Sequence, residues 1–103
     1  MKQDKLEYNF AEKFTKTPGP RYRRLGEFSG EEFREILEKL LKEYEIIEID
    51  GSGITTSFSP SFLSEAFGKL AETMGNDELF RRIKLFSNSN PNLEEKFRNY
   101  AKV

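Results

Sequence analysis

The chain has 103 residues, a formal net charge of −1, and neither histidine nor cysteine. Its length predicts one domain over residues 1–103, and its nearly balanced charge argues against nucleic-acid and membrane partners. Without His or Cys it lacks the commonest general base, thiolate nucleophiles and zinc ligands, so we expect a protein that is not an enzyme and uses no metal or cofactor.

The N-terminal segment favours a cytoplasmic protein that begins with a strand. It has no apolar stretch of signal-peptide length, and a chain without cysteine suits a reducing compartment. Leu6, Tyr8 and Phe10 alternate with polar residues, which predicts a half-buried strand. Residues 16–20 hold two prolines and a glycine and predict a turn. We expect residues 21–25 to form a second strand, antiparallel to the first.

The next element is an amphipathic helix that begins at a capping box. Ser29 and Glu32 have the spacing at which each side chain can bond the backbone amide of the other. Apolar residues then recur at helical spacing from Phe33 to Tyr44, with charged residues on the opposite face. This pattern predicts a core-facing helix.

The centre of the chain predicts a buried strand, a polar turn and a second helix. Residues 45–50 are rich in isoleucine and predict the central strand of the sheet. After a loop rich in Gly, Ser and Thr, Ser59 suits the N-cap and Pro60 the first helical position. Apolar residues continue at helical spacing to Met74, and Gly75 is placed to end the helix.

The C-terminal part predicts a short helical turn over residues 78–81, an edge strand over residues 82–86 and a last helix after Asn90-Pro91. Strands that alternate with helices indicate an α/β fold with right-handed crossovers. We expect a mixed sheet of four or five strands with helices mostly on one face.

Three segments, together with the strand that ends at Asp50, resemble a known family. The three segments are the Pro18–Arg21 loop, the helix start Ser29–Phe33 and the helix segment Ser61–Gly68. These look like the Pro-Gly-x-Arg, Ser-Gly-Glu-x-Phe and Ser-Phe-x-x-Glu-x-Phe-Gly segments of the STAS-like family of unknown function. That family is related to the STAS domain of bacterial anti-sigma factor antagonists. The likeness runs over almost the whole chain and implies a single STAS-like α/β domain.

The resemblance also implies a signalling role in protein binding. In STAS antagonists, a serine at the start of the helix after the third strand is phosphorylated by an ATP-binding, histidine-kinase-like protein, which is also the partner. Here the candidate phosphoacceptors are Ser61, Ser57 and Ser59, although the Asp-Ser dipeptide of true antagonists is missing. The expected partner-binding residues are Asp50, Gly51, Ser52, Gly53, Thr55, Thr56, Phe58, Phe62 and Glu65.

Several residues keep more than one interpretation. Ser59 is either an N-cap only or a phosphoacceptor, whereas Ser61 would point its hydroxyl outward from the first turn. Phe58 either packs under the helix against Leu63 or is exposed for a partner. The turn at residues 50–61 could instead bind a small ligand or a nucleotide. Arg21, Arg23 and Arg24 form either an anion-binding patch or a solvated surface.

Overall fold

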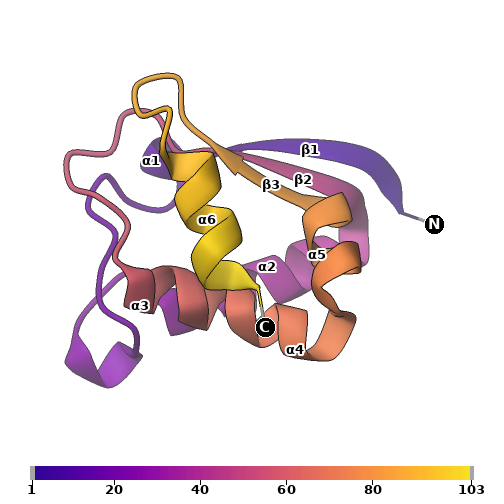
Figure 1. The fold of residues 1–103 in the computed structure, drawn as a ribbon, viewed down its shortest axis with the longest axis horizontal. Helices are drawn as coiled ribbons and strands as arrows, with labels where there is room; N and C mark the ends of the chain where they lie inside the picture. The colour runs from indigo at the N-terminus through magenta and orange to yellow at the C-terminus, as the bar shows by residue number, and fades with distance from the viewer. Residues whose placement is uncertain (1, 103) are drawn as a thin grey trace.

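The computed structural model describes residues 2–102 as a layer of helices against one face of a three-stranded sheet (Figure 1). The elements are β1 (Gln3–Asn9), α1 (Phe10–Lys13), the 3₁₀ helix η1 (Arg23–Leu25), α2 (Gly30–Glu43), β2 (Tyr44–Asp50), α3 (Pro60–Leu63), the π-helix η2 (Ser64–Gly68), α4 (Lys69–Met74), α5 (Asn76–Arg82), β3 (Ile83–Phe86) and α6 (Leu93–Ala101). The predicted α/β order and the central position of β2 are confirmed. Within residues 2–102 no helix is long and apolar enough to cross a membrane.

The sheet has the order β1-β2-β3, and both pairs are parallel. It therefore has three strands rather than four or five, and it is parallel rather than mixed. Side chains alternate between two faces along each strand. Ile47, Ile49, Ile83 and Leu85 turn their side chains toward the helices and are almost completely buried.

The predicted strand over residues 21–25 is wrong, and with it the antiparallel N-terminal pair. Residues 23–25 form η1, and Leu25 is 60% exposed. The segment is used to cap α2 instead, because the carbonyls of Pro20 and Arg21 accept from the amides of Gly30 and Glu31 at 2.9 and 3.0 Å. These bonds satisfy amides that have no partner within the helix. The outer edge of β1 is left without a neighbouring strand in the described part of the chain.

The two predicted helix caps are confirmed. The Ser29 hydroxyl accepts from the Glu32 amide at 3.1 Å, and the Ser59 hydroxyl accepts from the Phe62 amide at 3.0 Å. We call α3, η2 and α4 together, residues 60–74, the central helix. Gly75 ends it with a φ of +89°, a value that suits glycine.

The core is built largely from phenylalanine rings. Phe10 lies at its centre, with ring centroids 5.0 Å from Phe33 and 4.8 Å from Phe58. Phe33 in turn packs against Phe62 and Phe67 of the central helix. These rings join the end of β1, α2 and the central helix into one apolar layer beneath the sheet. Fully buried aromatic rings of this kind dominate the energetics of a small core.

The edge strand β3 is confirmed, but it begins one residue later than predicted. Arg82 ends α5 and is 92% buried, with an exposed fraction of 8%. Its guanidinium donates to the carbonyls of Leu41, Tyr44 and Glu45 at 2.8 to 2.9 Å, so it satisfies the end of α2. Beside it, a hydrogen bond from Arg81 lowers the pKa of the Glu45 carboxyl.

Candidate functional site

The turn at residues 51–59 lies where the three parallel strands end. Asn9, Asp50 and Phe86 are aligned across the sheet at its carboxyl edge, and the turn leads from that edge to the central helix (Figure 1). In open α/β sheets, binding sites form preferentially outside the carboxyl ends of the strands. We call residues 51–59 the site turn.

The first half of the site turn is held against the end of β3. The Asp50 carboxylate accepts from the Ser52 amide at 2.8 Å, which closes a tight turn. The Gly51 amide donates to the Phe86 carbonyl at 2.7 Å, and the Ser52 hydroxyl accepts from the Asn88 amide at 2.8 Å. A Cβ on Gly51 would lie 2.7 Å from the Leu93 side chain, so glycine allows this close approach without displacing that side chain. Asp50 therefore has a structural partner and acts as a turn-former.

The second half is tied to two other parts of the chain. The Thr55 amide donates to the Lys16 carbonyl at 2.8 Å, and the Thr55 hydroxyl reaches the same oxygen at 3.3 Å. The Lys96 ammonium of α6 donates to the Phe58 carbonyl. The site turn is thus fixed at several points, although Gly53, Thr55 and Thr56 remain exposed to solvent. A surface held in this way is pre-organised for binding.

Phe58 and Phe62 do not belong to the exposed surface, so their prediction as partner contacts is wrong. Phe58 is 1% exposed and Phe62 is fully buried. The Phe58 ring lies 4.8 Å from Phe10 and 5.6 Å from Phe62, centroid to centroid. Phe58 therefore packs under the helix, which was the first of its two predicted interpretations, and its ring contacts those of Phe10 and Phe62. Both rings anchor the site turn from below.

The three candidate phosphoacceptors differ in what their hydroxyls do. Ser59 is half-buried, and its hydroxyl caps the central helix. Ser57 is exposed in the site turn, and Ser61 is exposed in the first turn of the helix. Within residues 2–102, neither Ser57 nor Ser61 forms a side-chain hydrogen bond. The hydroxyls of Ser57 and Ser61 are therefore free to react, whereas that of Ser59 has a structural role.

We expect Ser59→Ala to lower the free energy of unfolding by about 1 kcal/mol, because it removes the N-cap of the central helix. Ser57→Ala is the matched control and should change stability by less than about 0.5 kcal/mol, since its side chain is exposed. Urea unfolding of the two variants measures the difference. Equal stabilities would show that the Ser59 cap contributes nothing.

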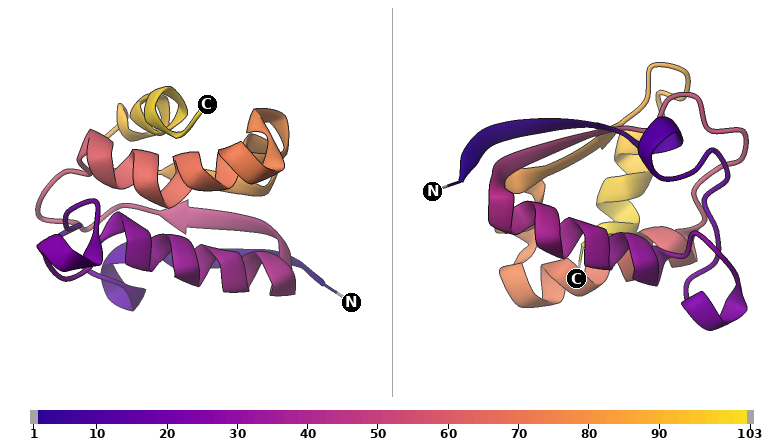
Figure 2. Two further views of the ribbon diagram at one scale, coloured as in Figure 1. Left: turned by 90° about the horizontal axis from the view of Figure 1, so that it is seen from below. Right: turned by 180° about the vertical axis from the view of Figure 1, so that it is seen from behind.

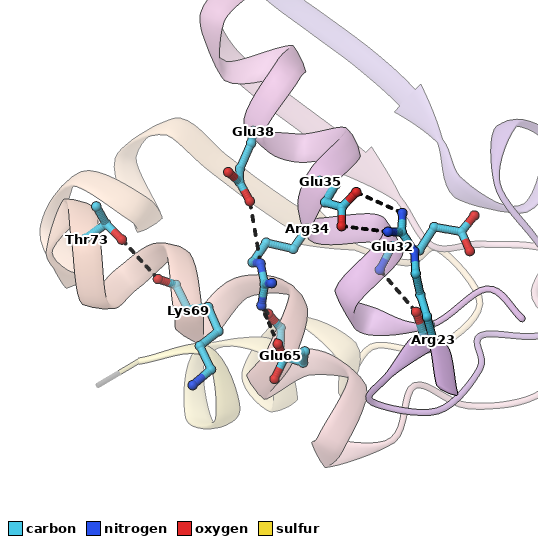
Figure 3. A network of polar contacts seen from close by, with 9 residues as sticks. Arg23, Glu32, Arg34, Glu35, Glu38, Glu65, Lys69 and Thr73 are labelled. Carbon is cyan, nitrogen blue, oxygen red and sulfur yellow. Dashed lines mark hydrogen bonds and ion pairs between the residues drawn. The ribbon is translucent and has the colours of Figure 1, made fainter. Parts of the chain in front are cut away.

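Glu65 is also buried, which makes it a wrong prediction as a partner contact. It is 3% exposed and forms an ion pair with Arg34 of α2, whose guanidinium also lies 3.5 Å from the Glu38 carboxylate. Figure 3 shows Arg34 reaching across from α2 to Glu65 on η2. The second carboxylate oxygen of Glu65, Oε1, is buried without a hydrogen-bond partner. The pair connects two elements of the core.

A groove of about 830 Å³ runs between α2 and the central helix, beside this ion pair. Figure 3 shows Lys69 and Thr73 following Glu65 along the central helix, on one side of the groove. The helix is π-helical at Glu65, a local geometry that occurs often at functional positions. The spacing of apolar residues did not predict the π-helical segment. Phe62, Ala66 and Leu70 recur at ordinary helical spacing before, within and after it, so the buried face of the helix reads as continuous in the sequence.

Arg21, Arg23 and Arg24 do not converge on one anion site. Arg23 donates two hydrogen bonds of 2.8 Å to the Glu35 carboxylate, which neutralises it. The guanidinium carbons of Arg21 and Arg24 lie over the Tyr22 ring, 5.9 and 5.2 Å from its centroid. Arg23 is thus paired with an acid, and Arg21 and Arg24 contact an aromatic ring. These contacts favour the interpretation of the cluster as a solvated surface.

The sequence did not single out Arg34, Arg82 or Lys96. Each reaches a partner more than 30 residues away in the chain, so no local pattern could identify the contact. One signal was present for Arg34, which lies next to the apolar stripe of α2 rather than on its outer face. Within residues 2–102 no group of three or more acidic side chains is placed to hold a metal ion.

The segments that carry the family resemblance meet in space. A Cβ on Gly30 would lie 2.7 Å from the Phe62 carbonyl oxygen and 3.1 Å from the Glu65 Cβ, so the start of α2 packs directly on the central helix. A Cβ on Gly19 would lie 2.2 Å from the Glu27 carbonyl oxygen. These glycines permit close backbone approach. The shared segments therefore specify how the loop, α2 and the central helix pack.

The family model of the STAS-like domain of unknown function matches residues 29–93 of the chain. The match covers more than half of the chain, including both helices of this interface, the central strand and the site turn, and the chain therefore belongs to that family. Neither a curated protein nor a solved structure gives a significant match.

Proposed function

We propose that this domain is a non-enzymatic regulatory module that binds a protein partner through the site turn and the exposed start of the central helix. The observation that carries the proposal is the position of Ser61. Its hydroxyl is exposed and unbonded on the first turn of a helix that Ser59 already caps. It thus offers a fixed, accessible hydroxyl beside an exposed and firmly held turn.

Phosphorylation of Ser61 is the proposed switch. The Ser61 Oγ would attack the γ-phosphorus of ATP held by an ATP-binding, histidine-kinase-like partner, and ADP would leave. The phosphoryl group adds nearly two negative charges at the positive end of the helix dipole, where the fold tolerates them. A partner docked on that surface would meet new charge and bulk. The modified domain would then be released.

Purified ATP-binding, histidine-kinase-like proteins of the source organism provide the test. We expect Ser61→Asp to weaken binding to the true partner by about tenfold or more, which corresponds to about 1.4 kcal/mol. Ser61→Ala should bind as the unchanged chain does but accept no phosphate. Titration calorimetry measures the affinity, and mass spectrometry after incubation with ATP locates the phosphate.

Thr73→Ala is the matched control, because Thr73 is an exposed hydroxyl residue near the far end of the central helix, away from the site turn. It should change neither binding nor phosphate incorporation. If phosphate were found on Ser57 instead of Ser61, the proposal of a phosphorylation switch would stand, but the phosphorylated residue would lie in the site turn. Binding that is unaffected by Ala or Asp at Ser57 and Ser61 would refute the proposal.

A small-ligand site is the second candidate, and a hollow of about 410 Å³ beside the site turn favours it. The hollow lies between residues 51–57 and 87–93, and hydroxyl, amide and apolar groups line it. That lining suits a neutral, hydroxyl-bearing ligand better than a triphosphate. Thermal unfolding with neutral polyols such as glucose, and with ATP and GTP for comparison, distinguishes the candidates, because a ligand that binds the folded state raises the melting temperature.

A further inference from the structure

The outer edge of β1 offers an open strand of seven residues. β1 pairs only with β2 in the described part of the chain, and Figure 2 shows it running along the free margin of the sheet. The segment that the sequence placed on this edge forms η1 and caps α2 instead. An exposed strand edge of this length is a template for pairing with another strand.

Two of the three charges of β1, those of Lys5 and Glu7, are placed symmetrically about Leu6, and the third, Asp4, lies on the other face of the strand. Lys5 and Glu7 lie on the sheet face without helices, together with Glu48 of β2. The Glu7 side chain is 80% exposed, and its nearest cation is Lys5 at 4.0 Å. Glu7 is therefore an edge carboxylate with room for a second cation.

A second copy of β1 fits this pattern in one symmetric register. In antiparallel pairing about a two-fold axis at Leu6, Lys5 lies opposite Glu7 of the second copy, and Glu7 lies opposite its Lys5. Opposed side chains of opposite charge stabilise such pairs, and like charges destabilise them. If the two-fold axis lay at Lys5 instead, Lys5 would face Lys5 of the second copy. If it lay at Glu7, Glu7 would face Glu7 of the second copy. Among the symmetric antiparallel registers centred on Lys5, Leu6 or Glu7, the charge pattern thus favours the one centred on Leu6.

The flank of α2 above this edge is also suited to contact. Leu6 of β1 and Ile36 and Leu40 of α2 are apolar and only partly buried. By helical spacing, Ile36 and Leu40 lie on the flank of α2 opposite to Arg34, which faces the central helix. In Figure 2 this flank of α2 lies on the β1 side of the molecule. A neighbouring chain at β1 would therefore cover apolar side chains as well as backbone.

We propose that β1 and the adjoining flank of α2 form the interface of a homodimer, in which two sheets join through antiparallel β1 strands. The occupant is a second copy of this chain, because the charges of β1 are complementary to themselves. The proposed interface is centred on Leu6 in the middle of β1, whereas the site turn follows the carboxyl end of β2. The inference is independent of the proposed function.

Charge reversal tests the register directly. Sedimentation velocity over a concentration series should give twice the chain mass of 12.1 kDa for the unchanged protein. Lys5→Glu should weaken the dimer by about tenfold or more, because two symmetric pairs change from attraction to repulsion. The double variant Lys5→Glu/Glu7→Lys restores opposite charges and should dimerise as the unchanged chain does.

Lys84→Glu is the matched control, since it makes the same charge change on the same sheet face but on β3. It should leave the dimer unchanged. Thermal unfolding of each variant verifies that the fold is retained. A chain that stays monomeric to its highest soluble concentration would overturn the proposal. So would a dimer indifferent to Lys5→Glu, or a folded double variant that remains monomeric.

Discussion

Phe58→Ala is expected to lower the free energy of unfolding by about 3–5 kcal/mol, the usual cost of truncating a buried phenylalanine. The ring is 1% exposed and packs against Phe10 and Phe62. Its backbone cannot easily move inward to fill the space, because the site turn is bonded to Lys16, Phe86 and Asn88. Urea unfolding followed by circular dichroism measures the loss.

The control for this change is Tyr100→Ala, which truncates an aromatic ring of α6 that is 45% exposed. We expect it to cost less than about 1 kcal/mol, as surface substitutions usually do. If Phe58→Ala proved as mild as Tyr100→Ala, Phe58 would not anchor the site turn.

The features predicted well from the sequence depend on signals that lie close together in the chain. Ser29 and Ser59 were identified as caps because an N-cap and the amide it bonds are three residues apart. The central strand and both long helices follow from the spacing of apolar residues, which directly reflects the buried face. The end of the central helix at Gly75 was predicted correctly, because a glycine that follows the last residue of an apolar stripe is a local signal.

The features that were predicted wrongly depend instead on contacts between residues far apart in the chain. Residues 21–25 have the composition of a short strand, yet the carbonyls of Pro20 and Arg21 accept hydrogen bonds from the start of α2. Glu65 looks like a surface acid, and only a partner 31 residues earlier explains its burial. Without that strand, the sheet has no fourth member within residues 2–102. Contacts between distant residues decided each of these features, and a local pattern cannot encode them.

The same distinction separates the shared family segments from the candidate site. Gly30, Phe62 and Glu65 lie in those segments, and all three are in close contact between α2 and the central helix. They determine how α2 packs on the central helix. The exposed hydroxyls of Thr55, Thr56 and Ser57 lie outside those segments. In the proposed function, these hydroxyls are the groups that the site turn offers to a partner.

The second large predicted loss of stability concerns the ion pair between Arg34 of α2 and Glu65 of the central helix. We expect Arg34→Ala to lower the free energy of unfolding by about 3 kcal/mol, because it leaves the buried Glu65 carboxylate without its partner. The value is at the low end for buried pairs, since the Arg34 side chain keeps 21% of its surface exposed. Arg23→Ala is the control. It removes an arginine whose side chain is about half exposed and should cost no more than about 1 kcal/mol.

The double variant Arg34→Met/Glu65→Leu separates packing from charge. With both charges replaced by apolar groups of similar size, no buried carboxylate is left unpaired, and we expect stability within about 1 kcal/mol of the unchanged chain. Urea unfolding of the single and double variants measures this coupling. A double variant as unstable as Arg34→Ala would mean that the ion pair itself, and not the avoidance of an unpaired charge, stabilises the interface. Because Ser61 lies one turn before Glu65 on the same helix, a stable double variant that still accepts phosphate would also show that the site needs this helix in place but not its ion pair.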